Sequence, residues 1–267
     1  MNTPTKDINL ALLIDVDNIA YRYTENILSE LSKYGKVTIR RMYGDWSQLR
    51  LKSWLSIASK YSLTPIMQPN NSPGKNASDI GLIIDAMDIL YSGEVEGFCI
   101  VSSDGDFNKL ATRIREAGKV VIGMGEKKTP ESFRDSCERF VFLDVLESAL
   151  DEDNEDGKDT DFSFPIVKND ALSPSNPLSK PSPLSSNTEA LNGAEITPRS
   201  ALENVIINMI SDNTAEGRDT NLSEIGTRLA KIYPDFDIRN YNYSKLSSFI
   251  KDFDSLSVTS RNKAVWV

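Results

Sequence analysis

Along roughly the first 150 residues of the chain, short apolar runs alternate with longer segments that place apolar residues on one helical face. Short, continuously apolar runs are typical of strands that are buried on both faces of a parallel sheet. The amphipathic segments between them are typical of helices that pack on such a sheet. The pattern therefore predicts an α/β domain built from successive β-α-β units.

The predicted elements follow one another in strict alternation. Strands are expected near Leu10–Val16, Lys36–Tyr43, Leu63–Gln68, Phe98–Ser102, Lys119–Gly123 and Phe140–Leu143. Helices are expected near Ile19–Lys33, Ser47–Tyr61, Ser78–Tyr91, Asp106–Ala117 and Pro130–Cys137.

The composition of the chain changes at about residue 151. Residues 151–196 begin with Asp-Glu-Asp-Asn-Glu-Asp and continue with repeated Pro, Ser and Asn. This segment has too few apolar side chains to offset the entropy lost on ordering. We expect a flexible linker, first acidic and then Pro/Ser-rich, between domains of residues 1–150 and 197–267. Such a tether would let both end domains engage one ligand.

The final segment, residues 197–267, returns to a folded pattern. A helix start at Thr197-Pro198-Arg199 precedes apolar residues at helical spacing, and strand-like pieces are expected at Leu256–Val258 and Ala264–Val267. A small winged-helix-like domain fits this pattern. A domain of this size needs large apolar side chains in its core. The expected core aromatics are Tyr233, Phe236, Phe249, Phe253 and Trp266.

The residue types that are missing or rare restrict the chemistry. The chain has no histidine, which excludes His general bases, Ser-His and Cys-His nucleophile pairs and His-ligated zinc. The two cysteines, Cys99 and Cys137, belong to or adjoin predicted buried strands, so we interpret them as buried thiols rather than as a disulfide or zinc ligands. Any catalysis must come from carboxylates, lysine, hydroxyls or a metal ion.

The net charge of −9 is concentrated in the predicted linker. Residues 1–150 carry 18 basic and 20 acidic side chains, residues 151–196 carry 3 and 10, and residues 197–267 carry 9 and 9. The two folded parts are therefore nearly neutral, and binding to a phosphate backbone is compatible with their charge. A polar start and the lack of long apolar stretches predict a soluble cytoplasmic protein without membrane contact.

Two of the predicted strands end in aspartates. Asp15 and Asp17 follow the first strand, and Asp104 and Asp106 follow the strand at Phe98–Ser102. The carboxyl ends of parallel strands lie at the same edge of a sheet, where ligands bind. Each aspartate alone is explained as a helix cap or turn residue. Several like charges at one apolar edge repel one another unless a cation is bound or a proton is shared.

A third element adds acidic residues to this edge. Asp79 stands at the start of the helix predicted for Ser78–Tyr91, Asp85 follows on the same helix, and Asp88 is expected on its solvated face. Oxygen ligands without His or Cys suit Mg²⁺ or Mn²⁺ rather than zinc. Such an ion activates water and stabilises the leaving oxygen of a phosphodiester without a protein nucleophile. The residues are therefore compatible with metal-dependent phosphodiester hydrolysis.

Four blocks of sequence, in this order, resemble the signatures of the NYN family, the PIN-like nuclease domains of bacterial and eukaryotic RNA-processing proteins. They are Asp15-Val-Asp17-Asn18, Tyr43-Gly-Asp45-Trp46, Lys75-Asn-Ala-Ser-Asp79 with Asp85-Ala-Met87, and Ser102-Ser-Asp104-Gly-Asp106-Phe107. The resemblance covers about residues 8–146. It implies a PIN-like (Rossmannoid) parallel sheet with flanking helices and the activity of a metal-dependent ribonuclease, which we expect to be an endonuclease.

The resemblance also assigns roles. It implies that the catalytic acids, which would also hold Mg²⁺ or Mn²⁺, are Asp15, Asp79, Asp104 and Asp106. It implies that the residues supporting them are Asp17, Asn18, Asp85 and Ser103. Among these, Asn18 would help to fix a metal or a phosphate, and Ser103 would lie in the same pocket.

The segment 197–267 resembles the OST-HTH or LOTUS domain. The similarity lies in Leu222-Ser-Glu-Ile-Gly226, Tyr233-Pro-Asp-Phe-Asp237, Asn240-Tyr241 and Lys245-Leu246. The chain has Tyr241-Asn-Tyr243 where the family usually has Tyr-Gly before its Lys-Leu. Some relatives bind structured or G-rich RNA and others bind protein, so the resemblance implies RNA or a protein partner as the ligand.

Several side chains are candidates for contacts with single-stranded or structured RNA. A phosphate backbone needs basic partners, and an unpaired base stacks on an aromatic ring. The candidates are Arg41, Trp46, Lys75, Lys109 and Lys245. For each basic residue, a solvated surface position is the competing interpretation, and Tyr43 is equally well explained by core packing.

Two alternatives remain open at this stage. Phosphatases of the haloacid dehalogenase type share an Asp-x-Asp motif after an apolar strand, but their chain makes a flap immediately after it. Here Asn18-Ile-Ala20 leads into a predicted helix. The other alternative is an RNA-binding or scaffold protein whose acidic site has no turnover.

Overall fold

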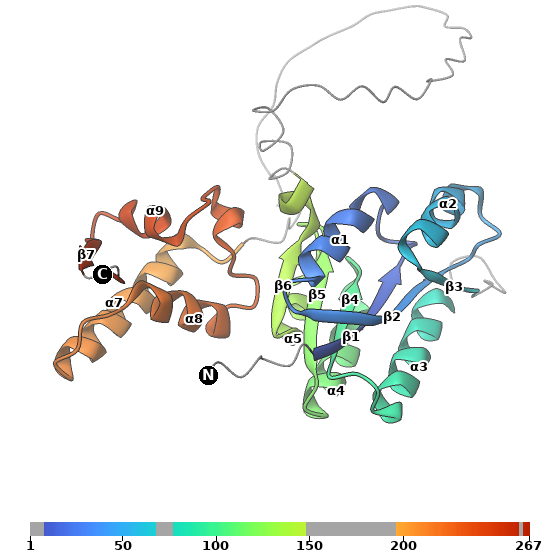
Figure 1. The fold of residues 1–267 in the computed structure, drawn as a ribbon, viewed down its shortest axis with the longest axis horizontal. Helices are drawn as coiled ribbons and strands as arrows, with labels where there is room; N and C mark the ends of the chain where they lie inside the picture. The colour runs from blue at the N-terminus through green and yellow to red at the C-terminus, as the bar shows by residue number, and fades with distance from the viewer. Residues whose placement is uncertain (1–7, 68–76, 148–195, 262–263) are drawn as a thin grey trace, which may run out of the picture.

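The computed structural model describes residues 8–67, 77–147, 196–261 and 264–267 (Figure 1). The N-terminal part contains a six-stranded parallel sheet in the order β3-β2-β1-β4-β5-β6. Its strands are β1 (Ile8–Asp15), β2 (Gly35–Gly44), β3 (Thr64–Met67), β4 (Gly97–Val101), β5 (Val120–Gly125) and β6 (Arg139–Phe142). The predicted PIN-like α/β fold is confirmed.

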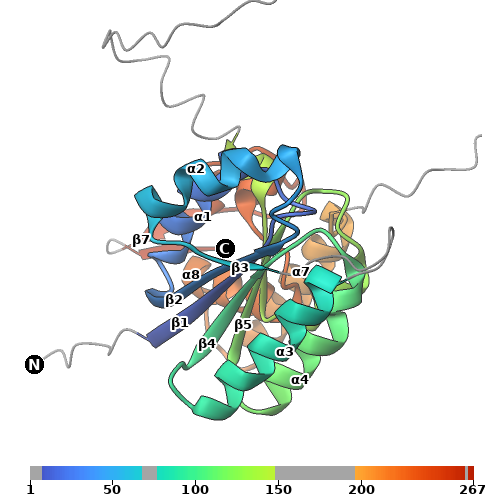
Figure 2. The same cartoon turned by 90° about the vertical axis from the view of Figure 1, so that its right-hand side faces the viewer.

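Helices cover both faces of the sheet, as Figure 2 shows. They are α1 (Thr24–Leu31), α2 (Lys52–Tyr61), α3 (Ala77–Ser92), α4 (Asn108–Glu116) and α5 (Glu131–Ser136). The first two begin later than predicted, because the 3₁₀ helices η1 (Tyr21–Tyr23) and η2 (Leu49–Leu51) precede them. The apolar spacing of these segments does not distinguish a 3₁₀ turn from the first turn of an α-helix.

The central strand β1 is buried on both sides. Leu10, Leu12 and Ile14 pack on one face with side chains of α1 and α2, whereas Ala11 and Leu13 pack on the other face with side chains of α3 and α4. Successive residues of a strand point to opposite faces, so burial of both faces requires the unbroken apolar run that the sequence contains.

The switch point of the sheet lies between β1 and β4. The chain adds β2 and β3 on one side of β1, and then returns to place β4 on the other side. Ile14 of β1 is the register partner of Val101 of β4, so the residues that follow both strands emerge side by side. This is the position where open parallel sheets bind ligands.

The C-terminal part forms a separate helical core. Its elements are α7 (Arg199–Ala215), α8 (Leu222–Ile232), η4 (Ile238–Tyr241), α9 (Leu246–Lys251) and the antiparallel strands β7 (Thr259–Arg261) and β8 (Ala264–Trp266). Phe236, Phe249 and Phe253 are buried in this core, and Tyr233 packs against it, as predicted.

Two expectations for the C-terminal part are wrong. Leu256 and Val258 are not in a strand; their half-buried side chains pack against the helical core, and strand pairing begins only at Thr259. Trp266 is half-buried and does not belong to that core, and its backbone pairs with Thr259 and with Asn221.

The two folded parts contact each other directly. The backbone N–H of Phe140 in β6 donates a hydrogen bond to the carbonyl oxygen of Pro234, at 2.8 Å. The predicted linker, apart from its last residue Ile196, and Lys75 lie outside the described residues. In the ranges that the structure describes, no helix combines the length and the apolar composition needed to cross a membrane.

Candidate active site

Asp15 ends β1 at the switch point and is 1% exposed. Its Oδ2 accepts hydrogen bonds from Nδ2 of Asn18 and from Oγ of Ser102, both at 2.7 Å, and its Oδ1 accepts one from the N–H of Asp17 at 3.1 Å. Burial raises the pKa of Asp15, although the hydrogen bonds from Asn18 and Ser102 oppose this effect. A carboxylate accepts about four hydrogen bonds, so one acceptor position of Asp15 remains for a ligand.

Asp17 follows β1 and connects the end of this strand to η2 and to α3. Its Oδ1 pairs with the guanidinium of Arg50 at 2.6 Å, and its Oδ2 accepts a hydrogen bond from Oγ of Ser78 at 2.8 Å. Arg50 belongs to η2 and Ser78 to the start of α3. Asp17 therefore supports the position of α3 beside Asp15. Sequence reasoning did not select Arg50 or Ser78, although Ser78 directly precedes Asp79.

Asp104 and Asp106 belong to a tight loop after β4. Asp104 caps η3 (Gly105–Phe107) by accepting a hydrogen bond from the N–H of Asp106 at 2.9 Å. The N–H of Asp104 in turn donates to Oγ of Ser102 at 3.0 Å, which connects this loop to Asp15. Asp104 is half-buried and Asp106 is exposed. The loop thus presents two carboxylates to solvent above the buried one.

Ser102, rather than Ser103, contacts the aspartates. Oγ of Ser103 accepts a hydrogen bond from the N–H of Glu126 at 3.0 Å and so holds the loop after β5. Successive side chains at the end of a strand point in opposite directions, so only one of the two serines can face Asp15. The sequence motif contains both serines and does not indicate which one.

Among the carboxyl groups of this site, that of Asp79 has the pKa most strongly shifted from its ordinary value. It is 9% exposed at the start of α3. Its pKa is raised to about 7, first by burial and then by the negative charges of Asp15, Asp104, Asp17 and Asp106. The electrostatic effect on Asp79 means that all five carboxyl groups share one region. A bound cation would relieve this repulsion.

The donors at this edge fit a hard divalent cation. They are carboxylate, hydroxyl and amide oxygens, which suit Mg²⁺ or Mn²⁺. Within the described residues, no three acidic or thiol side chains already surround one point. Water commonly supplies the remaining ligands of Mg²⁺.

Asp85 lies farther along α3 and makes a different set of contacts. Its two carboxylate oxygens accept short hydrogen bonds from the guanidinium of Arg41 and from the hydroxyl of Tyr43. Tyr43 is fully buried, and burial together with the charge of Asp85 raises its pKa. Asp85 therefore fastens α3 to β2. Arg41, a candidate for RNA contact, is engaged in this ion pair.

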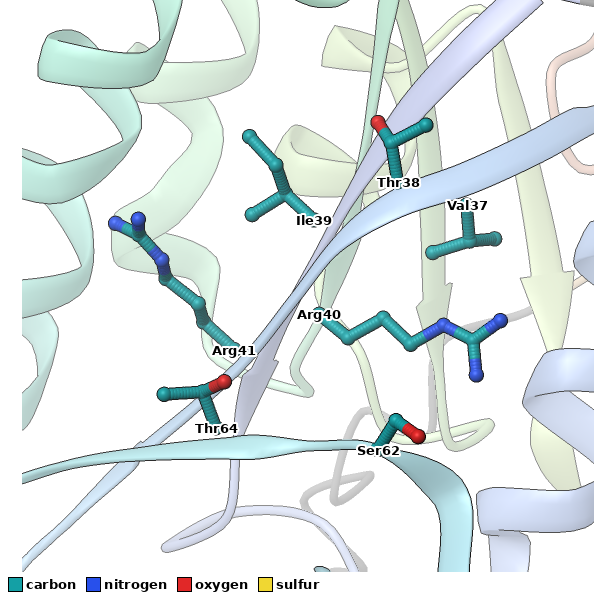
Figure 3. A pocket seen from close by; sticks show the side chains of 7 residues that line it. All are labelled: Val37, Thr38, Ile39, Arg40, Arg41, Ser62 and Thr64. Carbon is teal, nitrogen blue, oxygen red and sulfur yellow. The ribbon is translucent and has the colours of Figure 1, made fainter.

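Arg40 and Arg41 also line a hollow of about 430 Å³ beside the part of β2 that extends beyond β3. Figure 3 shows their side chains pointing to opposite faces of β2, with Ser62 and Thr64 nearby. One nitrogen of Arg40 donates to the carbonyl oxygen of Tyr61 at 2.9 Å. Both arginines thus have structural partners, and no aspartate lines the hollow itself.

The other RNA candidates differ in their surroundings. Nε1 of Trp46 donates to the carbonyl oxygen of Ile66 at 2.9 Å, and its ring packs partly against the core, so Trp46 helps to hold β3. Lys109 and Lys245 are exposed, and no acidic partner is found for either one in the described parts of the chain. These two lysines are free to contact phosphates.

A parallel sheet with acidic residues at its switch point, joined to a helical module, places the protein in the class of PIN-like α/β proteins. The sequence matches the NYN domain over residues 9–144 and the OST-HTH/LOTUS domain over residues 197–267. The chain belongs to the NYN domain family, since that match covers half of it. NYN domains belong to a nuclease superfamily that typically uses divalent metals, and OST-HTH/LOTUS domains are associated with RNA binding.

The chain is also similar to a solved structure, that of a protein of unknown function from Vibrio parahaemolyticus RIMD 2210633. The sequences are 23% identical, the similarity covers 55% of this chain and 98% of the other, and the TM-score is 0.46. No curated protein matches this chain.

Proposed function

We propose that this protein is a metal-dependent endoribonuclease that cuts RNA phosphodiesters at the aspartate edge of its NYN domain. The catalytic acids in this proposal are Asp15, Asp79, Asp104 and Asp106. The observation that carries it is the environment of Asp79, whose pKa of about 7 reflects burial beside four other carboxyl groups. Such a concentration of negative charge at a ligand-binding edge is costly unless it holds a cation.

The residues around the acids have separable tasks in this proposal. Asn18 and Ser102 fix the orientation of Asp15, and Asp17 holds the start of α3 through Ser78. A bound Mg²⁺ or Mn²⁺ would supply an activated water and stabilise the negative charge that develops on the phosphate. Exposure of Asp106 gives the RNA access to the site.

The C-terminal domain would supply affinity for RNA. The association of OST-HTH/LOTUS domains with RNA supports this role. Lys245 in this domain and Lys109 in α4 are exposed and free of acidic partners in the described parts of the chain, so each can pair with a phosphate.

The geometry argues against a phosphatase with an aspartyl nucleophile. Asp15, which would have to attack the phosphate, is 1% exposed, and both of its oxygens accept hydrogen bonds. A nucleophile must be accessible to its substrate, and burial withholds Asp15 from a phosphate in solution. A protein that binds RNA without cutting it is the second candidate, and the lack of a preformed three-acid cluster within the described residues favours it.

Cleavage of labelled single-stranded and structured RNA by the purified chain tests the proposal. We expect cleavage with Mn²⁺ or Mg²⁺, none with a chelator, and a loss of at least about a hundredfold in Asp104→Asn, the size expected when a group that stabilises the transition state is removed. Asp88→Asn is the matched control, because Asp88 is exposed on α3. Tight binding of intact RNA under all of these conditions would instead support the binding protein.

A further inference from the structure

The C-terminal domain contacts the NYN domain through its Pro234-Asp235-Phe236-Asp237 segment. Pro234 accepts the backbone hydrogen bond from Phe140 of the edge strand β6. Asp237 pairs with Arg139 at 3.2 Å, and Arg239 pairs with Glu30 of α1 at 3.2 Å. The contact therefore covers an exposed sheet edge and reaches α1, at a place different from the aspartates.

The most buried ion pair of this contact joins Asp235 to Arg134 of α5, at 2.9 Å. The two side chains are only 10% and 3% exposed. The second oxygen of Asp235 accepts a hydrogen bond from Oγ of Thr197 at 2.9 Å, and the Arg134 guanidinium lies 5.6 Å from the ring centre of Phe142. Removal of Asp235 would break this buried pair, which joins α5 to the C-terminal domain.

The start of α5 also packs on the loop that carries Asp104 and Asp106. Gly105 of this loop lies close to Pro130, the residue that directly precedes α5. A Cβ added to Gly105 would be only 3.1 Å from Cγ of Pro130. The rings of Phe107 in the loop and Phe133 in α5 are 6.3 Å apart. Movement of α5 would therefore move the loop.

We propose that Asp235 and Arg134 are positioning residues, through which the docked C-terminal domain holds α5 and thereby sets the position of Asp104 and Asp106. This inference rests on the proposed function, because those two acids are its proposed metal ligands. Packed side chains connect the domain contact to the loop without a gap, since Phe133 also lies 5.9 Å from Phe140. The C-terminal domain then tunes the cation site in addition to binding RNA.

Titration of the full-length chain with Mn²⁺ tests this inference, with the rise in Tm as the readout beside RNA cleavage. In Asp235→Asn we expect a given rise in Tm to need at least about threefold more Mn²⁺ than in the wild type, an effect typical of coupling through packed side chains. Arg134→Lys keeps the charge and should give a smaller shift. Glu30→Gln is the matched control, because it removes an ion pair of the same contact at α1, which packs on the opposite face of the sheet from α5.

Hydrogen exchange supplies a second readout. Amides of residues 104–107 should exchange faster in Asp235→Asn than in the wild type or in Glu30→Gln, whereas those of β1 should not change. An unchanged Mn²⁺ titration in Asp235→Asn, with RNA cleavage intact in the wild type, would overturn the inference and leave the nuclease proposal standing. If the wild type binds Mn²⁺ but cuts no RNA, the nuclease proposal fails. The comparison of Mn²⁺ titrations between Asp235→Asn and the wild type then tests the inference by itself. A wild-type chain that binds no Mn²⁺ would contradict both the inference and the nuclease proposal.

Discussion

Ionisation of the Asp79 carboxyl group destabilises the fold, so the effect of Asp79 on stability depends on pH. Its pKa is about 7 in the folded protein, against an ordinary value of 3.8. Between these pH values the folded chain holds a proton that the unfolded chain has lost, so stability decreases as the pH rises through this range. Because one pKa unit is worth about 1.4 kcal/mol, the ionised form costs the fold up to roughly 4 kcal/mol above pH 7.

Asp79→Asn should therefore stabilise the metal-free protein at alkaline pH. The amide has the size of the carboxyl group without its charge. We expect a Tm at pH 8 that is higher than that of the wild type by at least about 3 °C, measured in the presence of a chelator. At pH 5 the wild-type Asp79 is protonated, so the difference should largely disappear. The same increase at both pH values would contradict the raised pKa.

The sequence was sufficient to predict the positions of the acids but not their partners. Asp15 ends one apolar strand and Asp104 closely follows another, and parallel strands bring such residues to one edge. Arg50 reaches Asp17 from a 3₁₀ helix, and its side chain has no distinctive pattern in the sequence. The choice of Ser102 over Ser103 depends on which of two successive side chains faces Asp15, and the motif does not indicate this.

At the scale of elements, α3 is held against β2 by Asp85. This residue receives hydrogen bonds from Arg41 and Tyr43, and it shares α3 with Asp79. Asp85→Ala should lower the free energy of unfolding by about 2 to 3 kcal/mol, because hydrogen bonds to a charged group are lost and the Tyr43 hydroxyl is left buried. RNA cleavage should also decrease, because the start of α3 carries Asp79.

Chemical denaturation measures this effect. Asp88→Ala is the control, since Asp88 is exposed on the same helix, and we expect it to change the stability by less than about 0.5 kcal/mol. Equal stability of the Asp85 and Asp88 variants would show that the contacts of Asp85 do not hold α3.

The elements themselves were well predicted where burial determines the pattern. All six strands of the sheet were expected. Burial of both faces produces continuous apolar runs in β1 and β4, whereas β2 and β3 are partly exposed and less apolar. The prediction failed at Leu256–Val258, where alternating apolar residues pack against helices instead of forming a strand. Alternation of this kind reports which side chains are buried and does not by itself identify the backbone conformation.

At the scale of the whole molecule, RNA binding should use both domains. Lys109 belongs to α4 and Lys245 to the C-terminal domain, and both are exposed. Either Lys→Ala change should weaken RNA binding and reduce the slope of log affinity against log salt by about 0.7, as expected for the loss of one contact with a single-stranded phosphate backbone.

Filter binding or fluorescence anisotropy at several salt concentrations gives this slope. Lys33→Ala is the control, because Lys33 is paired with Glu30 at 2.7 Å and precedes β2, at the edge of the sheet opposite the aspartates. A slope that changes in Lys33→Ala and not in Lys245→Ala would place the RNA elsewhere on the protein.

The contact between the domains was not predictable from local pattern. Sequence reasoning separated the two domains by composition and treated the connection as a tether. The pair of Arg134 and Asp235 joins residues about a hundred positions apart, and neither has a distinctive context in the sequence. Such a pair forms only when the two folded domains pack against each other.

The measurement that tests the central claim most directly is cleavage of an RNA with sulfur in place of a non-bridging oxygen at the cut phosphate. If the aspartates hold a cation against this phosphate, sulfur should slow cleavage in Mg²⁺ by at least about tenfold, because Mg²⁺ prefers oxygen ligands. Mn²⁺ accepts sulfur more readily and should restore much of the rate. Equal rates for oxygen and sulfur substrates in Mg²⁺, or cleavage that persists in a chelator, would contradict a metal ion at the cut phosphate.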